Sequence, residues 1–186
     1  MSETNTKLPT WTVDPMHTTV MFSVRHLMIT TVHGVFEDVR GSVHYDAKRP
    51  EASQLAIEIP AATIDTRQAQ RDAHLRSPDF FDVEKHPTVR FRSTKVGVKG
   101  GQIREIAGEL TIRDTTREVV LTVDEVTDEQ RDHNGKLRIG ASAHGKLLRS
   151  EFGMTYNKVL ETGGVAVSDE IKLKFELSLL RDEPNA

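Results

Sequence analysis

Eight histidines are the residues that most readily suggest chemistry in this chain, because imidazole binds transition metals and moves protons near neutral pH. They are His17, His26, His33, His44, His74, His86, His133 and His144. None stands in a compact ligand spacing such as His-x-x-x-His, although separate strands can also bring metal ligands together. We expect His26 to end an inward strand face as a core histidine. We expect most of the others to lie on the surface, and we expect no metal site.

Nucleophiles and phosphate-binding loops are not recognisable either. The chain has no cysteine, which excludes disulfides, thiolate metal sites and cysteine nucleophiles. No Gly-x-Ser-x-Gly motif occurs, and Gly97, Gly100 and Gly101 form a turn with no helix after it to bind phosphate. Carboxylate pairs such as Asp79 and Asp82 are typical of solvated loops. The residues therefore predict that the protein is not an enzyme.

One segment combines charged and aromatic residues. Residues 65–77 read DTRQAQRDAHLRS, with a capping box at Asp65 and Gln68, so the pattern predicts one short helix near residues 66–76. Its apolar surface is too small for a core helix, and we expect it to lie across the molecule as a cover. Phe80 and Phe81 follow in a polar loop. They either fix the helix to the core or line the mouth of a cavity beneath it, and the sequence favours neither.

Alternation of apolar and polar residues dominates the rest of the chain and predicts half-buried strands. The clearest run, at residues 171–179, places on one face Ile171, Leu173, Phe175, Leu177 and Leu179. Turn signals such as Asn134-Gly135 separate these runs. About eight strands with hairpin-length links predict an all-β fold, an extended antiparallel β-barrel, because closure removes the exposed edges of a sheet.

Composition and charge exclude several classes of protein. With 25 basic and 28 acidic residues the net charge is −3, and no basic stripe is visible, so we expect no nucleic-acid partner. No run approaches the roughly 18 apolar residues of a membrane-spanning helix, and residues 1–10 lack the apolar segment of a secretory signal. We therefore expect a cytoplasmic protein with a flexible tail at residues 1–10, one barrel domain at residues 11–181 and a second tail at residues 182–186.

Several motifs carry a resemblance. The first block contains Asp14-x-x-His17-Thr18, Phe22-x-Val24-x-His26-Leu27, Gly34-x-Phe36 and Gly41. The central block contains Ile64-Asp65-Thr66, Arg71-Asp72-x-His74-Leu75-Arg76-Ser77 and Asp79-Phe80-Phe81-Asp82-Val83-Glu84-Lys85-His86-Pro87. Later blocks are Phe91-x-Ser93-Thr94, Gly108-x-Leu110-Thr111, Arg149-Ser150-x-Phe152-Gly153-Met154 and Val167-Ser168-Asp169-Glu170-Ile171. From about Trp11 to Leu179 the chain resembles the YceI-like family, the polyisoprenoid-binding, lipocalin-like proteins.

The resemblance implies a lipocalin-like antiparallel barrel of about eight strands around a long apolar cavity. It implies a polyisoprenoid or similar fatty-chain lipid as the ligand, with no other cofactor, and a homodimer. Many members are secreted, which residues 1–10 do not support. One departure is Arg113-Asp114-Thr115-Thr116, where the family typically has a glycine turn. Since Asp tolerates turn geometry, we expect an altered loop and the same fold.

Apolar residues on the expected inward faces and nearby loops are candidates for the cavity wall. With His26 included, they are Phe22, Val24, His26, Val39, Val43, Phe80, Phe91, Ala141, Phe152 and Phe175. Candidates for polar contacts near a lipid head group are Arg25, Arg71 and His74. Two other functions stay open at this point: a metal-dependent enzyme acting on a hydrophobic substrate, and a stress-related scaffold whose cavity is incidental.

Overall fold

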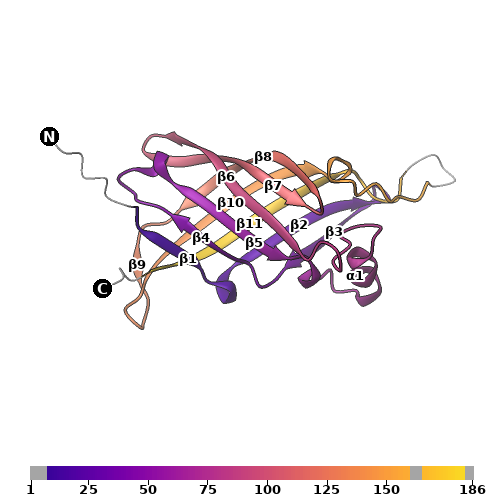
Figure 1. The fold of residues 1–186 in the computed structure, drawn as a ribbon, viewed down its shortest axis with the longest axis horizontal. Coiled ribbons are helices and arrows are strands. Elements are labelled where there is room, and N and C mark those ends of the chain that lie inside the picture. The colour runs from indigo at the N-terminus through magenta and orange to yellow at the C-terminus, as the bar shows by residue number, and fades with distance from the viewer. Residues whose placement is uncertain (1–7, 160–164, 183–186) are drawn as a thin grey trace.

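The computed structural model describes residues 8–159 and 165–182, most of which are in β-strands (Figure 1). The strands are β1 (Thr10–Val13), β2 (Thr19–His26), β3 (Thr30–Phe36), β4 (Arg40–His44), β5 (Gln54–Pro60), β6 (Thr88–Lys99), β7 (Gln102–Ile112), β8 (Thr115–Val126), β9 (Gln130–Arg131), β10 (Leu137–Leu148) and β11 (Glu170–Arg181). The described part has one α-helix, α1 (Ala69–Arg76). Its short 3-10 helices are η1 (Pro15–His17), η2 (Pro50–Ala52), η3 (Ala61–Thr63) and η4 (Arg149–Phe152).

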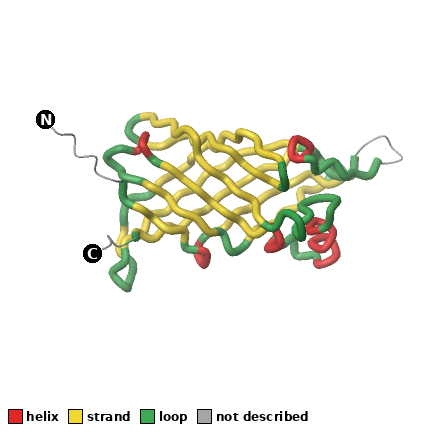
Figure 2. The backbone as a smooth tube through the Cα atoms, in the orientation of Figure 1, coloured by secondary structure: helices red, strands yellow, loops and turns green. Residues whose placement is uncertain are grey.

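Eight of these strands close into an antiparallel barrel. Its circuit runs β11, β1, β4, β5, β6, β7, β8, β10, and the pairing of β10 with β11 closes it. β1 and β2 pair with successive parts of β11, so the β2–β3 hairpin extends the wall at one end. Figure 2 shows the strands inclined to the long axis and crossing between the two walls. The predicted all-β barrel with one short helix is confirmed.

The two ends of the barrel differ. α1 and the tip of the β2–β3 hairpin lie at one end, and β9 lies at the other (Figure 1). The predicted tails at residues 1–10 and 182–186 fall largely outside the described residues, but Thr10 and Asp182 are described and fixed. The Asp182 N–H donates to the Thr10 carbonyl at 2.9 Å. No helix in the described part is long and apolar enough to span a bilayer.

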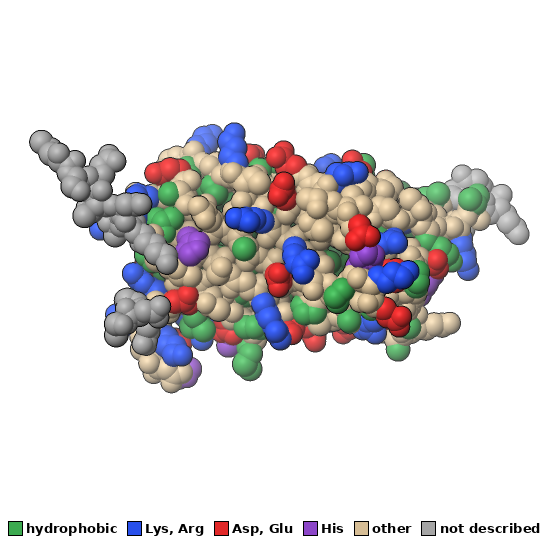
Figure 3. Space-filling view, in the orientation of Figure 1, with side chains coloured by type: hydrophobic (Ala, Val, Ile, Leu, Met, Phe, Trp, Pro, Cys, Tyr) green, Lys and Arg blue, Asp and Glu red, His purple; other side chains and the backbone are tan. Residues whose placement is uncertain are grey.

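Period-two alternation accounts for which strand residues are buried. On β11, Leu179 is buried, whereas Lys172 and Lys174 are exposed on the opposite face. The largest fully buried side chains are Trp11, Val39, Ile64 and Phe152. Over the visible outer face, basic and acidic side chains are interspersed (Figure 3), as the near-balanced charge of the sequence suggests.

α1 begins later than the capping box predicts. Gln68 is the N-cap, and its side chain accepts from the Arg71 N–H at 2.5 Å. The backbone of Asp65 is instead paired with Val35 of β3, through hydrogen bonds of 2.9 and 3.0 Å. A residue held in a strand bridge cannot begin a helix, which is why Asp65 does not cap α1.

Two turns also differ from the sequence pattern. Between β2 and β3, Leu27 and Met28 both have positive φ, 52° and 57°, although neither is a residue type that favours this conformation. At Asn134-Gly135, between β9 and β10, only Gly135 has positive φ. The β7–β8 connection is a two-residue turn in which Arg113 has φ 57°. The fold is kept, as expected, and the alteration of this loop relative to the family stays a prediction.

Candidate functional site

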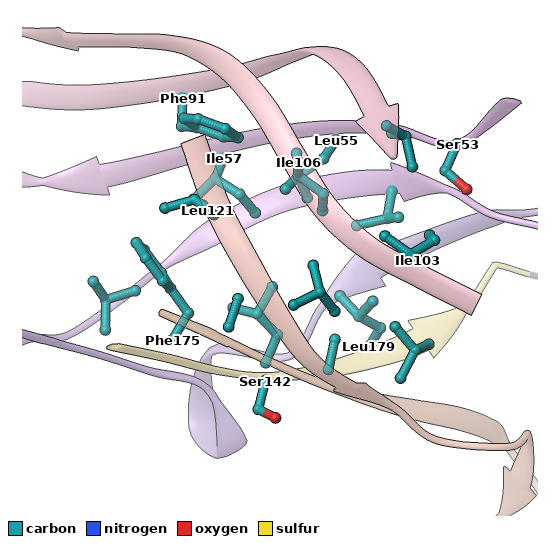
Figure 4. A pocket seen from close by; sticks show the side chains of 18 of the residues that line it. Ser53, Leu55, Ile57, Phe91, Ile103, Ile106, Leu121, Ser142, Phe175 and Leu179 are labelled. Atoms are coloured by element: carbon teal, nitrogen blue, oxygen red, sulfur yellow. The ribbon is translucent and has the colours of Figure 1, made fainter. Parts of the chain in front are cut away.

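The interior of the barrel contains an apolar cavity of about 110 Å³, which we call the central cavity. Inward residues of the barrel strands line it, including Ile57, Phe91, Leu121 and Phe175, which converge on one space in Figure 4. The polar side chains of its wall are Tyr45, Ser53, Gln54 and Ser142. Figure 4 places Ser53 and Ser142 at the margin of the cluster. A wall of this kind suits a hydrocarbon chain.

A second cavity of about 130 Å³, the helix-end cavity, lies toward α1. Phe22 and Val24 of β2 line it, together with Leu75 of α1 and the following Phe80 and Phe81. Six residues line both cavities: Val20, Ile59, Val89, Leu110, Leu173 and Phe175. The two cavities therefore adjoin along the barrel, and we call them together the passage.

Two glycines make room for aromatic residues of this passage. A Cβ atom at Gly34 of β3 would overlap the ring of Phe22, and one at Gly108 of β7 would lie 2.5 Å from Cζ of Phe91. Both glycines are buried and pair directly with strand neighbours, Gly34 with Phe22 and Gly108 with Ser93. Each ring therefore rests on backbone where any other residue would place a side chain.

The structure brings seven of the ten predicted wall residues to the passage. Phe22, Val24 and Phe80 line the helix-end cavity, Val43, Phe91 and Ala141 line the central cavity, and Phe175 lines both. Their role in lipid binding stays a prediction. Both alternatives for the Phe80–Phe81 pair stay open. Both residues line the helix-end cavity, and Phe81 also packs edge-on against the buried Phe36 at 5.6 Å.

The other three predicted wall residues lie elsewhere. Val39 and Phe152 are 0% and 1% exposed and belong to the solid core, outside the wall of either cavity. His26 is exposed at the last position of β2, where it forms a bridge to Val167. It is not a core histidine, because the inward face of β2 ends at Val24 and the strand continues past the wall.

The three predicted head-group contacts are all occupied by protein atoms. Arg25 donates to the carbonyls of Met28 and Ile29 at 2.8 and 3.2 Å, which fixes the β2–β3 turn. Arg71 donates to Oγ1 and O of Thr66 at 2.7 and 2.8 Å. His74 contacts Asp79 at 2.8 Å and stacks edge-on against Phe80 and Tyr156. Their contact with a lipid head group stays a prediction.

Arg149 is the charged residue of the passage that sequence reasoning did not single out. It is 5% exposed and lines the helix-end cavity. Its guanidinium donates to four backbone carbonyls, at 2.6 to 3.4 Å, those of Met154, Tyr156, Val167 and Ser168. Burial lowers the pKa of Arg149 below its ordinary value. In the sequence, the one feature that pointed to Arg149 was its position as the first residue of the Arg149-Ser150-x-Phe152-Gly153-Met154 block. Arg149 holds the segments that close this end.

Asp72 performs the same task for α1. It is 5% exposed, and its Oδ1 accepts from the N–H and Oγ1 of Thr66 at 2.9 and 2.5 Å. Burial raises the pKa of Asp72, but the hydrogen bonds from Thr66 and the charges of Arg76 and Arg71 outweigh it, so the pKa lies below its ordinary value. The carboxylate therefore ties the helix to the preceding segment.

Metal-ligating groups do not gather in the described part of the chain. Among residues 8–159 and 165–182, no three His, Asp or Glu side chains come together as ligands would. Several histidines pair with one carboxylate each, as His17 does with Asp14 and His144 with Asp124. The expectation that the protein needs no metal stays a prediction.

Comparisons with known proteins agree with this geometry. Residues 11–179 match the family model of the YceI-like domain. A protein of Azotobacter vinelandii named UPF0312 protein is 37% identical over 138 residues, which are 74% of this chain and 71% of the relative.

Solved structures share the fold. The Campylobacter jejuni YCEI protein has a TM-score of 0.71 and 30% identity, covering 86% of this chain and 90% of its own. A polyisoprenoid binding domain from Saccharophagus degradans has a TM-score of 0.64 and 11% identity, covering 95% and 100%. Together with an eight-stranded barrel around an apolar passage, the match over residues 11–179 means that the chain belongs to the YceI-like family.

Proposed function

We propose that this protein binds a polyisoprenoid or a similar long-chain amphiphile in the passage, and that it sequesters or carries this lipid. The observation that carries the proposal is the wall of the helix-end cavity, where Arg149 is the one charged residue and its donors are engaged by carbonyls. A hydrocarbon chain gives up no hydrogen bonds on entering such a space, whereas a polar substrate would lose its hydration.

The expected affinity follows from the buried length of the chain. Each buried methylene contributes about 0.8 kcal/mol, so ten buried units contribute about 8 kcal/mol. This corresponds to a dissociation constant of about 1 μM before the cost of ordering the chain. A passage that extends through both cavities favours long ligands over short ones.

We do not propose catalysis. A general acid or base must lie within hydrogen-bond reach of the reacting group. In the walls of the two cavities, the ionisable side chains are Arg149 and Tyr45. They line different cavities, so no acid–base pair faces a bound chain.

Two further features belong to the proposal. We propose that the protein lies in the cytoplasm, and, by resemblance to the family, that it is a homodimer. Cell fractionation checks the first and sedimentation equilibrium checks the second. A periplasmic fraction or a monomer at micromolar concentration would contradict them separately, leaving lipid binding untouched.

The direct test is organic extraction of the purified protein followed by mass spectrometry, and titration of the delipidated protein with a fluorescent isoprenoid alcohol. We expect a stoichiometric single-chain lipid in the extract and saturable binding in the titration. A protein that yields no lipid and binds neither isoprenoid nor alkyl chains would overturn the proposal.

A further inference from the structure

The barrel wall is incomplete between β5 and β6. Backbone pairing of these strands runs from Pro60 and Thr88 to Ala56 and Arg92 and then ends. β6 continues for seven more residues, 93–99, toward the β6–β7 turn without a β5 partner (Figure 1). At the point of separation the Leu55 N–H donates to Oγ of Ser93 at 2.8 Å rather than to a backbone carbonyl. In place of a hydrogen-bonded ladder, η2 and the residues that follow it pack against β6 here.

The side chains here separate the central cavity from an outer groove of about 620 Å³. Four residues line both spaces: Ser53, Gln54, Leu55 and Val96. Ser53 Oγ is buried and has no hydrogen-bond partner among the described residues. A buried hydroxyl without a partner is costly, so it marks a position suited to a polar group that the chain itself does not supply.

The groove carries cations that no protein group engages. Arg92 and Lys95 of β6 line it, both exposed, and neither side chain forms an ion pair or hydrogen bond with any described residue. By contrast, Arg90, two residues away on the same strand, pairs with Glu58 at 3.1 Å and does not line the groove. One carboxylate, Glu51 of η2, also lines the groove. The two cations therefore outnumber the anion beside the gap.

The cations at the opposite end of the passage differ in this respect. Arg25, Arg71 and Arg149 donate to carbonyl or hydroxyl oxygens of the chain. An anionic group at that end would have to displace these bonds, whereas one in the groove would not. Charge-assisted hydrogen bonds to an anion are stronger than neutral ones.

We infer that the groove is the head-group site of an anionic single-chain amphiphile, whose tail passes through the β5–β6 gap into the central cavity. The inference rests on the proposed function and adds the head-group class and the entrance. Arg92 and Lys95 bind a phosphate, diphosphate or carboxylate, and Ser53 donates to the ligand where it crosses the wall. The entrance lies beyond the last β5–β6 backbone pair, that of Ala56 with Arg92.

The experiment measures dissociation constants for matched pairs of ligands on the delipidated full chain. One arm compares geranylgeranyl phosphate with geranylgeraniol, and the other compares hexadecanoate with hexadecanol. For the wild type we expect at least one anion to bind about tenfold more tightly than its alcohol. R92Q/K95Q should reduce that ratio to near one by weakening the binding of the anion. R90Q, which removes the same kind of charge beside the groove, should keep the ratio.

Two further variants sharpen the test. E51Q should increase the preference for the anion, and S53A should weaken binding of both members of a pair with no loss of thermal stability, because it removes a hydroxyl that has no partner. If the phosphate alone is preferred, the site takes an isoprenoid phosphate; if the carboxylate alone is preferred, it takes a fatty acid.

The outcomes separate the two proposals. Equal binding of alcohol and anion by the wild type would overturn the head-group site and leave the proposed function intact. So would an unchanged ratio in R92Q/K95Q. Absence of binding to all four ligands would overturn the proposed function itself. Inorganic phosphate at about tenfold molar excess over protein should not displace the bound anionic ligand, because the tail contributes most of the binding free energy.

Discussion

At the residue scale, two buried charged groups, those of Arg149 and Asp72, bind backbone or hydroxyl groups of segments that must be held in place. Arg149 gathers four carbonyls, and Asp72 accepts two hydrogen bonds from Thr66. The sequence could place both residues in family motifs, but not their partners, since these contacts join segments whose relative position only the closed barrel determines.

Replacement of Asp72 tests its role directly. Asp72→Ala leaves the N–H and Oγ of Thr66 without their acceptor, at a cost of about 1–3 kcal/mol, and we expect faster hydrogen exchange at residues 65–82 with the barrel amides unchanged. Asp72→Asn keeps an acceptor oxygen and should lose less protection. Unchanged exchange throughout that segment in Asp72→Ala would contradict this role.

Phe175 tests whether the passage is hollow. Because it lines both cavities, Phe175→Trp should narrow their junction, weakening binding of a C20 chain more than that of a C10 chain, with a stability loss below about 1 kcal/mol. Phe152→Trp is the matched control: Phe152 is 1% exposed in the solid core, so overpacking should cost about 1–3 kcal/mol without any dependence on chain length. Thermal melts and ligand titrations distinguish the two variants. If affinity depends on chain length in the same way for wild type and Phe175→Trp, Phe175 does not lie at the junction of the two cavities.

At the scale of elements, periodicity predicted the strands well, and turns and caps less well. The run at residues 171–179 became β11 because alternation alone decides which face of a strand is buried. Leu27-Met28 could not be predicted as a tight turn, since neither residue favours positive φ; the antiparallel pairing of β2 with β3 and the bonds from Arg25 impose it. Val39 and Phe152 were expected in the cavity wall because polarity patterns do not distinguish wall from solid core.

The β2–β3 turn supplies a stability prediction. Met28 is 59% exposed with φ 57°, so Met28→Gly removes backbone strain and little packing, and should stabilise the protein by about 1 kcal/mol, or roughly 2–4 °C in Tm. Ile29 is even more exposed, at 73%, but lacks positive φ, so Ile29→Gly should destabilise the protein. Calorimetry compares the two, and a fall in Tm for Met28→Gly would show that the turn stores no strain.

A second prediction concerns the carboxylates around Arg138, at the β9 end. Hydrogen bonding to Arg138 lowers the pKa of Asp132 to about 2, and the same guanidinium lowers the pKa of Asp14. A carboxyl group whose folded pKa is depressed stabilises the fold above its unfolded pKa, near 3.8, and loses that contribution as the pH falls through its folded pKa.

The stability difference between wild type and Arg138→Gln should therefore be largest above about pH 5 and shrink toward pH 2. Urea unfolding between pH 7 and pH 2.5 measures it, with Arg90→Gln as a variant whose ion pair is exposed and whose effect should be small at every pH. A difference that does not change with pH would contradict the assignment.

At the scale of the whole molecule, the barrel and its apolar interior were predictable from alternation and the family motifs, whereas the division of the interior and the gap in the wall were not. The gap arises where β5 ends its pairing at Ala56 while β6 continues, a mismatch of strand ends that no local pattern records. In the sequence, nothing distinguishes Arg92 and Lys95 from other exposed strand residues. The structure shows that both line the same groove.

Chelation tests the protein as a whole. Since no three described His, Asp or Glu side chains gather, we expect chelator-treated protein to keep its Tm and its affinity for a labelled isoprenoid. The measurement is a titration before and after treatment, with elemental analysis of the same sample. If chelation abolishes binding and one divalent ion restores it, the histidines form a metal site and the metal-dependent alternative gains support.

The glycines beneath Phe22 and Phe91 have a consequence for how ligand preference can evolve. A methyl group at Gly34 or Gly108 would force the adjoining ring off the backbone, and the free direction for each ring is the passage it lines. Under the proposed function, a methyl group in place of one hydrogen at either glycine would shorten the longest chain that the passage accepts, although neither glycine lines a cavity. A comparison of the lining residues alone would miss this effect.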